Sequence, residues 1–429
     1  MWLKQTTPAE RRTLAATFAG YGVDGFDYMI YTFLIPTLIA AWSMSKAEAG
    51  YIATGALITS AIGGWAAGVL ADRFGRVRVL QWTVLWFALF TALSGLTSSF
   101  WQLFLTRTMQ GFGMGGEWAV GSVLIAETIA AKHRGKAAGL VQSSWAVGWA
   151  ASALAFWGLY SVLSPGVAWK VLFWIGILPA LLILYIRRKL DEPAIYRAEQ
   201  ARVRATGQRG SFLRIFSPGL LHYTLLASLL ATGMQGAYYS VTTWLPTFLK
   251  TERHLSVLGT STYLLVLIGG SFAGYLASAW LSDTIGRRRC FMAFALMGGV
   301  LVLSYTQMPI TDGQMLLLGF PLGFFLSGIF SGMGAFLSEL FPSDVRGSGQ
   351  GFCYNVGRAI GAICPALIGH LSASVPLGQV LGWMAAGCYG LVIVAAALLP
   401  ETRGRELAGG TGEPGADPIP TSHSRRAAA

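Results

Sequence analysis

The sequence predicts an all-α integral membrane protein with twelve transmembrane helices in two pseudo-symmetric six-helix lobes. Three observations lead to this fold class. Of the 429 residues, 54% are hydrophobic and only 12% are charged, against about 25% charged in a typical soluble domain. Apolar stretches near the ~20 residues that cross a bilayer as a helix recur along the chain. Motifs of the first half also return in the second.

Twelve apolar segments are the expected membrane spans. In the first half they cover residues 13–41, 49–71, 79–97, 101–128, 138–163 and 168–187. In the second half they cover 218–249, 257–282, 290–307, 314–339, 350–374 and 378–400. The first span is expected to be retained, because no small-residue cleavage site follows a short apolar core.

The net charge of +12 is explained by where the basic residues lie. When the amino terminus is placed inside, 25 of the 31 Lys and Arg residues fall in the termini and inner loops, and two, Arg107 and Arg358, fall within spans. This positive-inside bias predicts a bacterial inner-membrane protein with both termini in the cytoplasm. We therefore expect a lipid bilayer around the protein and no nucleic-acid partner.

An internal repeat divides the chain. "LADRFGRVR" (70–78) and "LSDTIGRRR" (281–289) share an Asp, a Gly and two Arg residues, among others, at an offset of 211, and a second set of four residues repeats at an offset of 212. The sequence thus predicts an N-terminal lobe (1–187), a basic cytoplasmic linker (188–217), a C-terminal lobe (218–402) and a disordered cytoplasmic tail (403–429).

This organisation resembles the major facilitator superfamily. Gly68 to Arg76 match its loop signature G-x-x-x-D-R-x-G-R, "RTMQGFGMGGEW" (107–118) resembles its fourth-span motif, and "PETRGREL" (400–407) resembles a closing motif of sugar and organic-acid porters. The resemblance covers the chain except the tail. The fifth span lacks the Gly- and Pro-rich signature of drug:proton antiporters, which argues against an efflux pump.

Three segments resemble narrower branches of the superfamily. "DGFD" (24–27) is similar to motifs of aromatic-acid:proton and sialic-acid:proton symporters. "GGEWAVGSVLIAE" (115–127) and "YNVGRAIGAICP" (354–365) are most similar to sialate- and lactate-type metabolite symporters. The resemblance implies proton-coupled transport of a small metabolite.

Charged residues inside the spans mark the candidate site. A charge at the bilayer centre costs at least about 2.5–3.5 kcal/mol, so each such residue calls for a partner or a function. Helical spacing gathers them on three faces. These faces carry Asp24, Asp27, Tyr28 and Tyr31 on the first span, Arg107, Gln110 and Glu117 on the fourth, and Asn355 and Arg358 on the eleventh. We expect these faces to point at partner helices or a water-filled cavity.

An acidic side chain is predicted to carry the coupled proton. Burial raises the pKa of a carboxyl group and a nearby cation lowers it, so a carboxyl whose cation comes and goes can load and release a proton. Asp27 is the first candidate, Asp24 the second and Glu117 the third. The alternative is that Arg107 and one of the aspartates only neutralise each other, and the two roles can coexist.

An arginine is predicted to anchor a substrate carboxylate, because guanidinium binds carboxylates through two parallel hydrogen bonds. Arg358 is the first candidate, supported by Asn355, and Arg107 competes with it. Tyr28 and Tyr31, on the same face as the aspartates, are further candidates for substrate contact. Other aromatic and amide side chains are expected to set specificity, although each could equally be core or face lipid: Gln142, Trp145, Gln235, Tyr238 and Tyr239.

The resemblance also implies a cytoplasmic charge lock that favours the outward-open state. Its residues would be Asp72, Arg73 and Arg76 with the partners Glu127 and Arg134, and the second-lobe copies Asp283, Arg287, Glu339 and Arg346. Positive-inside topology alone would explain the arginines of this set, but it leaves Asp72 and Asp283 without a reason.

Together these features predict a secondary active transporter that imports a small organic acid by proton symport through alternating access. A uniporter or an exporter of the same anions is the nearest alternative, and a non-transporting receptor is a remote one. We expect no enzyme activity, cofactor or metal, because the five His and four Cys residues share no ligand spacing. A monomer is expected. The substrate stays open among aromatic acids, muconate-like diacids, sialic acid, shikimate and short monocarboxylates.

Overall fold

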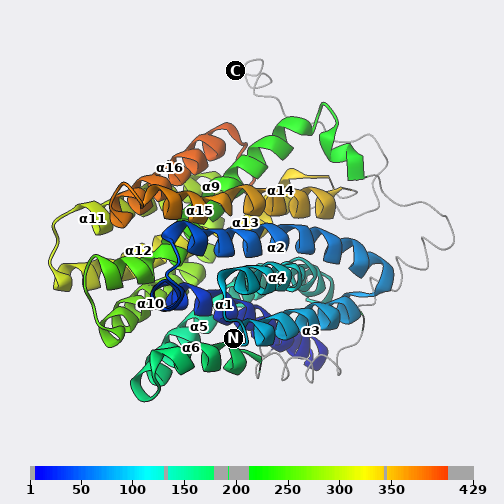
Figure 1. Ribbon diagram of the computed structural model, residues 1–429. Helices are drawn as coiled ribbons and strands as arrows, with labels where there is room; N and C mark the ends of the chain where they lie inside the picture. Colours follow the sequence, from blue (N-terminus) through cyan, green and yellow to red (C-terminus); the bar gives the residue numbers. More distant parts are fainter. Residues whose placement is uncertain (1–4, 130–133, 178–191, 193–211, 343–344, 404–429) are drawn as a thin grey trace, which may run out of the picture.

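The computed structural model describes residues 5–129, 134–177, 192, 212–342 and 345–403, and every regular element in these residues is a helix (Figure 1). The N-terminal lobe contains α1 (Pro8–Trp42), α2 (Lys46–Phe74), α3 (Arg76–Ser94), α4 (Phe100–Thr128), α5 (Arg134–Val162) and α6 (Pro165–Ile175). The 3-10 helix η3 (Phe212–Phe216) precedes the C-terminal lobe. That lobe contains α9 (Leu221–Thr251), α10 (Val257–Ile285), α11 (Arg287–Gln307), α12 (Asp312–Gly328), α13 (Met333–Leu340), α14 (Arg346–Gly361), α15 (Ile363–Leu371) and α16 (Leu377–Leu398).

Eight helical segments of the described residues are long and apolar enough to cross a membrane, with α12–α13 and α14–α15 each counted as one segment. Helices α4, α5 and α9 have comparable lengths of 29, 29 and 31 residues. Several polar side chains of these helices are buried, among them Gln110 of α4, Ser152 of α5 and Gln235 of α9. The predicted span 168–187 is described only in part, and the linker 188–217 and the tail 403–429 lie mostly outside the described residues.

Capping boxes set where three helices begin: Thr7 with Glu10, Ser45 with Glu48, and Thr311 with Gln314. In the first of them, the Glu10 N–H donates to the Thr7 hydroxyl at 3.2 Å and the Thr7 N–H donates to the Glu10 carboxylate at 2.7 Å. Each box satisfies N–H groups that the first helical turn leaves without partners. Helix α1 therefore starts before the predicted residue 13.

Two predicted single spans are broken helices in the structure. The span expected over 314–339 divides into α12 and α13, and the span expected over 350–374 divides into α14 and α15 at Ala362. Near the second break, the Thr54 hydroxyl of α2 donates to the Ala362 carbonyl at 2.6 Å and accepts from the Ala366 N–H at 3.2 Å. Ala362 is the N-cap of α15, so its carbonyl also faces the Ala366 N–H across the first turn of that helix. Pro365 has no N–H to donate to the Gly361 carbonyl, and this missing bond is the local cause of the break.

The two lobes meet along three helix pairs. Helix α2 packs along α14 and α15, α5 packs against α10, and α1 against α9 (Figure 1). The contacts along α2 step in order from Gly50 beside Pro365, through Thr54 beside Ala362, to Ser60 beside Arg358. Helix α2 therefore runs antiparallel to α14–α15 across the middle of the protein.

A matching pair of glycines marks one end of the two lobes. Gly75 joins α2 to α3 with φ +106°, and Gly286 joins α10 to α11 with φ +101°. A side chain at either position would be strained, because this region of φ favours glycine. We call this end of the protein the Gly75 end, and the opposite end, where α1 turns into α2 at Ser43, the Ser43 end.

Candidate functional site

The five charged candidates for the transport site are all buried: Asp24, Asp27, Arg107, Glu117 and Arg358. This agrees with the inward-facing helical stripes that their spacing predicts. They lie on α1, α4 and α14, and the structure divides them into two regions. Asp27 and Arg107 form a pair inside the N-terminal lobe, whereas Arg358 lies where the two lobes meet.

Asp27 of α1 is held by side chains of two other helices of the N-terminal lobe, α3 and α4. Arg107 Nη1 of α4 lies 2.8 Å from Asp27 Oδ2 and forms a salt bridge in which Asp27 is fully buried and Arg107 is 2% exposed. Gln110 Nε2 donates to the same oxygen at 2.9 Å, and the Thr91 hydroxyl of α3 donates to Oδ1 at 2.8 Å. This is the salt bridge expected between Arg107 and one of the aspartates.

The surroundings of this pair are aromatic and dry. The Arg107 guanidinium carbon lies 5.9 Å from the centre of the Tyr31 ring and 5.5 Å from that of Phe173. The Tyr31 hydroxyl itself donates to the Ala49 carbonyl at 2.7 Å. In such a low-dielectric site, removing one charge of a pair is strongly destabilising. Asp27 and Arg107 therefore depend on each other for compensation of their charges.

Arg358 lies at the interface between the lobes and is 3% exposed. Its Nη1 donates to the Ser60 hydroxyl of α2 at 2.8 Å, its Nη2 to the Tyr354 hydroxyl at 3.2 Å, and its Nε to Gln235 Oε1 at 3.4 Å. Within the described residues, these acceptors are all neutral. Because a buried guanidinium keeps its charge, this site is suited to an anion.

Close helix packing sets the position of Ser60. A Cβ atom added at Gly115 of α4 would lie 1.7 Å from the Ser60 carbonyl oxygen, and one at Gly111 would lie 2.1 Å from the Ala56 carbonyl oxygen. Glycines in the fourth-span motif region thus allow the backbones of α2 and α4 to touch. This contact places the Ser60 hydroxyl opposite α14.

Aromatic side chains from both lobes form a cluster that reaches Arg358 through Gln235, whose Oε1 accepts from Arg358 Nε and from the Tyr239 hydroxyl, each at 3.4 Å. The Trp145 indole N–H of α5 donates to the Tyr238 hydroxyl of α9 at 2.6 Å, and the Tyr28 and Thr243 hydroxyls lie 3.0 Å apart. The Tyr28 and Tyr239 rings are 5.6 Å apart. These contacts bring together side chains that the sequence proposed from separate spans.

A stacked pair of aromatic rings lies beside Arg358. The Trp118 ring of α4 lies 3.6 Å from the Tyr354 ring of α14, with an angle of 8° between the planes. The Arg358 guanidinium carbon lies 4.9 Å from the centre of the Tyr354 ring. Tyr354 therefore contacts a side chain of the opposite lobe through its ring and Arg358 through its hydroxyl.

The amide candidates differ in their surroundings. Gln235 bridges helices, since its Nε2 donates to the Tyr354 carbonyl at 2.8 Å. Asn355 Nδ2 donates to the Gly351 carbonyl at 2.9 Å, and within the described residues its buried Oδ1 has no hydrogen-bond partner. Gln142 is half-buried on α5. Of the three, Gln235 and Asn355 lie beside or one turn from Arg358.

The N-terminal members of the predicted charge lock cluster at the Gly75 end. Arg76 Nη2 lies 3.2 Å from Glu127 Oε1. The Glu192 carboxylate accepts from the Arg76 N–H at 2.8 Å and from the Val77 N–H at 3.0 Å, at the start of α3. Arg73 is exposed, and the side chains of Asp72 and Arg134 lie outside the described residues.

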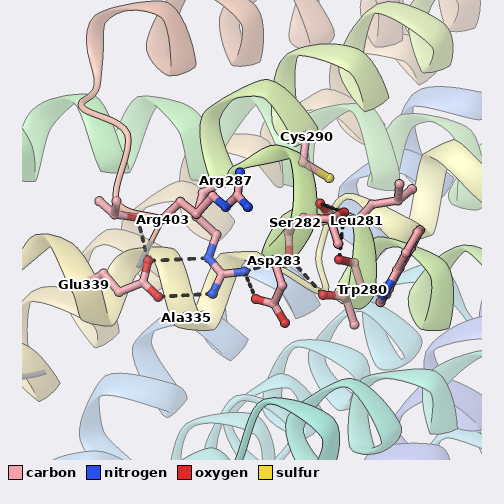
Figure 2. Close-up of polar contacts among 12 residues, drawn as sticks. Trp280, Leu281, Ser282, Asp283, Arg287, Cys290, Ala335, Glu339 and Arg403 are labelled. Carbon is pink, nitrogen blue, oxygen red and sulfur yellow. Dashed lines mark hydrogen bonds and ion pairs between the residues drawn. The ribbon is translucent and has the colours of Figure 1, made fainter. Parts of the chain in front are cut away.

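The C-terminal copies form a similar cluster. Figure 2 shows Arg287 directed between Asp283 and Glu339, with its Nη2 3.2 Å from Glu339 Oε1. The Glu401 carboxylate accepts from the Arg287 N–H at 2.8 Å, as Glu192 does at α3. Arg346 Nε donates to the Ser338 carbonyl at 3.0 Å. Each of these contacts joins elements within one half of the chain, so a lock between the lobes stays a prediction.

The sequence profile of the Major Facilitator Superfamily matches residues 17–311 and 267–427. The chain belongs to this superfamily. A Cupriavidus pinatubonensis protein called "Probable 4-methylmuconolactone transporter" is 40% identical over 94% of this chain and 93% of its own. The "Cis,cis-muconate transport protein" of Acinetobacter baylyi is 32% identical over 85% of this chain and 88% of its own.

A solved structure of the same superfamily has the same fold. The structure of the proton:xylose symporter XylE bound to 6-bromo-6-deoxy-D-glucose matches with a TM-score of 0.75 over 93% of this chain and 98% of that one, at 18% identity. The predicted major facilitator fold is confirmed, and this superfamily member is a multi-pass membrane transporter and not an enzyme.

Several residues of the site were not among the sequence-based candidates. Tyr354 precedes Arg358 by four residues, so helical spacing could have identified it. Trp118 adjoins Glu117 and offered a weaker signal. Ser60 and Thr91 carried none, because each is one of many hydroxyls in apolar helices and its partner comes from a distant part of the chain.

Proposed function

We propose that this superfamily member imports a small carboxylate by proton symport, with Arg358 as the anion anchor and the Asp27–Arg107 pair as the proton-coupling element. One observation carries the proposal. Arg358 is a buried guanidinium at the meeting of the two lobes, and its hydrogen-bond acceptors in the described residues are neutral. A carboxylate bound there would supply the missing negative charge.

The surroundings of Arg358 favour an unsaturated or aromatic carboxylate. Tyr28, Trp145, Tyr238 and Tyr239 present ring faces and polar edges from both lobes. Flat carbon skeletons pack well on such faces. The two relatives named above refer to 4-methylmuconolactone and to cis,cis-muconate, an unsaturated dicarboxylate. This supports a substrate of the same size and chemistry.

The proton is proposed to bind at Asp27. The carboxylate accepts three side-chain hydrogen bonds, one of them from Arg107 in a salt bridge. A rearrangement that draws Arg107 away would leave a buried carboxylate, which binds a proton readily in an apolar site. Asp24 and Glu117 are buried on the same two helices and are the alternative proton sites.

The proposed orientation in the membrane is based on the charge distribution along the chain. The positive-inside bias supports an inner-membrane protein with cytoplasmic termini, so the Gly75 end would face the cytoplasm. The protein is proposed to act as a monomer, since each polypeptide contains both lobes.

A proteoliposome assay tests the proposal. Purified protein is reconstituted and offered cis,cis-muconate, benzoate and the neutral analogue benzamide under an inward proton gradient. We expect accumulation of a carboxylate above its external concentration, together with acidification of the lumen, and no accumulation of benzamide. Facilitated entry that ignores the gradient would instead indicate a uniporter, and gradient-driven loss of carboxylate from loaded vesicles would indicate an exporter.

Arg358→Lys tests the anchor. Lysine keeps the charge but lacks the two parallel N–H groups, so we expect the KM for the carboxylate to rise about tenfold or more, as for the loss of a charged hydrogen bond. Transport kinetics over a range of substrate concentrations measure this change. An unchanged KM would move the anchor to Arg107.

A further inference from the structure

Arg358 directs its two terminal nitrogens at hydroxyl groups from opposite lobes. The Ser60 hydroxyl oxygen of α2 lies 2.8 Å from Nη1, and the Tyr354 hydroxyl oxygen of α14 lies 3.2 Å from Nη2. Ser60 is fully buried and Tyr354 is 3% exposed. These two oxygens come from residues 294 positions apart in the chain and meet at one guanidinium.

The arrangement corresponds to the way in which arginine binds a carboxylate. In a bidentate pair, two oxygens of one carboxylate accept from two nitrogens of the guanidinium fork. Here two hydroxyl oxygens accept from the same fork. They supply the hydrogen bonds of a carboxylate without its charge, and they occupy the nitrogens that a substrate would use.

We propose that Ser60 and Tyr354 are carboxylate surrogates that let the unloaded transporter close around Arg358. The inference rests on the proposed function and assigns a step of the cycle to two residues. A symporter that accumulates its substrate has to reorient unloaded after each release. In that step Arg358 has no substrate, and a buried N–H group without an acceptor is costly.

Exchange does not need the surrogates. When substrate is present on both sides of the membrane, the transporter can cross in each direction with a carboxylate on Arg358. Loss of a surrogate should therefore slow net uptake and leave exchange much less affected. A residue that simply binds substrate, or that only supports the fold, would change both rates together.

Ser60 is the better residue to test, because it is the acceptor from the lobe opposite Arg358. Its hydrogen bond forms only when α2 lies against α14, and water can replace it when the lobes separate. The close contact of α2 with α4 at Gly115 fixes its position within the N-terminal lobe. Loss of the Ser60 hydroxyl should therefore affect only the state in which the two lobes are closed around Arg358.

The experiment compares net uptake and exchange in the same proteoliposomes, with cis,cis-muconate as the probe. The variants are Ser60→Ala, Ser60→Thr, which keeps the hydroxyl, and Ser152→Ala. Ser152 is a matched control, because it is fully buried and donates to the Trp149 carbonyl of its own helix at 2.7 Å. We expect Ser60→Ala to lower the ratio of net uptake to exchange about tenfold, the effect of one unsatisfied buried donor. The two other variants should keep the wild-type ratio.

Tyr354→Phe provides the second test, since it keeps the ring against Trp118 and removes the acceptor for Nη2. Its ratio of net uptake to exchange should also fall. An unchanged ratio in both Ser60→Ala and Tyr354→Phe, or an equal loss of both rates, overturns the surrogate role while leaving the proposed function intact. Failure of the wild-type protein to accumulate or exchange any carboxylate overturns the proposed function itself. Thermal unfolding of each variant identifies any that fold poorly.

Discussion

At the scale of single residues, two buried arginines of this transporter differ in their partners. Arg107 is paired with Asp27 inside one lobe, whereas Arg358 contacts neutral acceptors from both lobes. A paired arginine is electrically balanced, and an arginine among neutral groups is not. This contrast is the reason for assigning proton coupling to the first site and anion binding to the second.

Asp27→Asn tests the coupling role. Asparagine cannot take up a proton, so we expect gradient-driven accumulation to be lost while exchange of substrate is retained in part. The variant also leaves the Arg107 charge without its partner, which costs about 3–5 kcal/mol in a buried pair. Uptake assays measure the first effect and thermal unfolding in detergent measures the second.

The double variant Asp27→Asn with Arg107→Gln separates the two effects. It removes both charges, so its unfolding temperature should lie above that of Asp27→Asn alone, whereas accumulation should stay lost. Accumulation equal to that of the wild type in either variant would remove Asp27 from the coupling mechanism.

At the scale of helices, the break between α14 and α15 joins the two lobes. The Thr54 hydroxyl donates to the Ala362 carbonyl and accepts from the Ala366 N–H. When α2 moves away, these two backbone groups still have each other as partners at the start of α15. Opening of the Ser43 end therefore leaves neither of them unsatisfied, and Pro365 keeps α14 and α15 separate.

Thr54→Val should favour the open Ser43 end. Valine has nearly the shape of threonine and lacks the hydroxyl, so the closed arrangement loses hydrogen bonds that contribute about 1 kcal/mol, or about fivefold in population. A cysteine introduced at Ala366, which is buried beside this contact, should react faster with a membrane-impermeant maleimide in this variant. Thr54→Ser keeps the hydroxyl and should react at the parental rate. Equal rates in all three proteins would mean that Thr54 does not hold this end closed.

At the scale of the whole molecule, the lobes touch on both sides of Arg358. Gly50 lies against Pro365 toward the Ser43 end, and a Cβ atom added at Gly139 would lie 3.3 Å from the Ala279 Cβ toward the Gly75 end. On the proposed function, substrate would reach Arg358 when one set of these contacts opens. Alternating access would then require that α5 and α10 separate at the Gly75 end once in each cycle.

A disulfide between Gly139→Cys and Ala279→Cys tests this requirement. Their Cβ atoms would lie close to the separation found in disulfides, about 3.8 Å. We expect oxidation of the double variant to stop both net uptake and exchange and reduction to restore them, whereas either single variant should not respond. Full transport by the cross-linked protein would show that the lobes need not part at this place.

Much of this architecture could be predicted from the chain. Hydropathy and the repeated glycine–arginine motifs depend only on local composition and order, so they indicated the membrane spans and the two halves. Helical spacing likewise placed Asp24, Asp27, Tyr28 and Tyr31 on one face. The helix breaks at 329–332 and Ala362 were not predicted. Pro365 was a local signal for the second of them, whereas the hydrogen bonds of Thr54 to the same place come from about 310 residues away.

By itself, the sequence determined that this protein is a helical membrane transporter of the major facilitator type and which charged residues its spans contain. The tertiary structure alone decided the partners of those charges: Asp27 for Arg107, and the hydroxyls of Ser60 and Tyr354 for Arg358. The physical reason is that burial and helical periodicity act within a segment, whereas the pairing of a buried charge depends on which distant helix packs beside it.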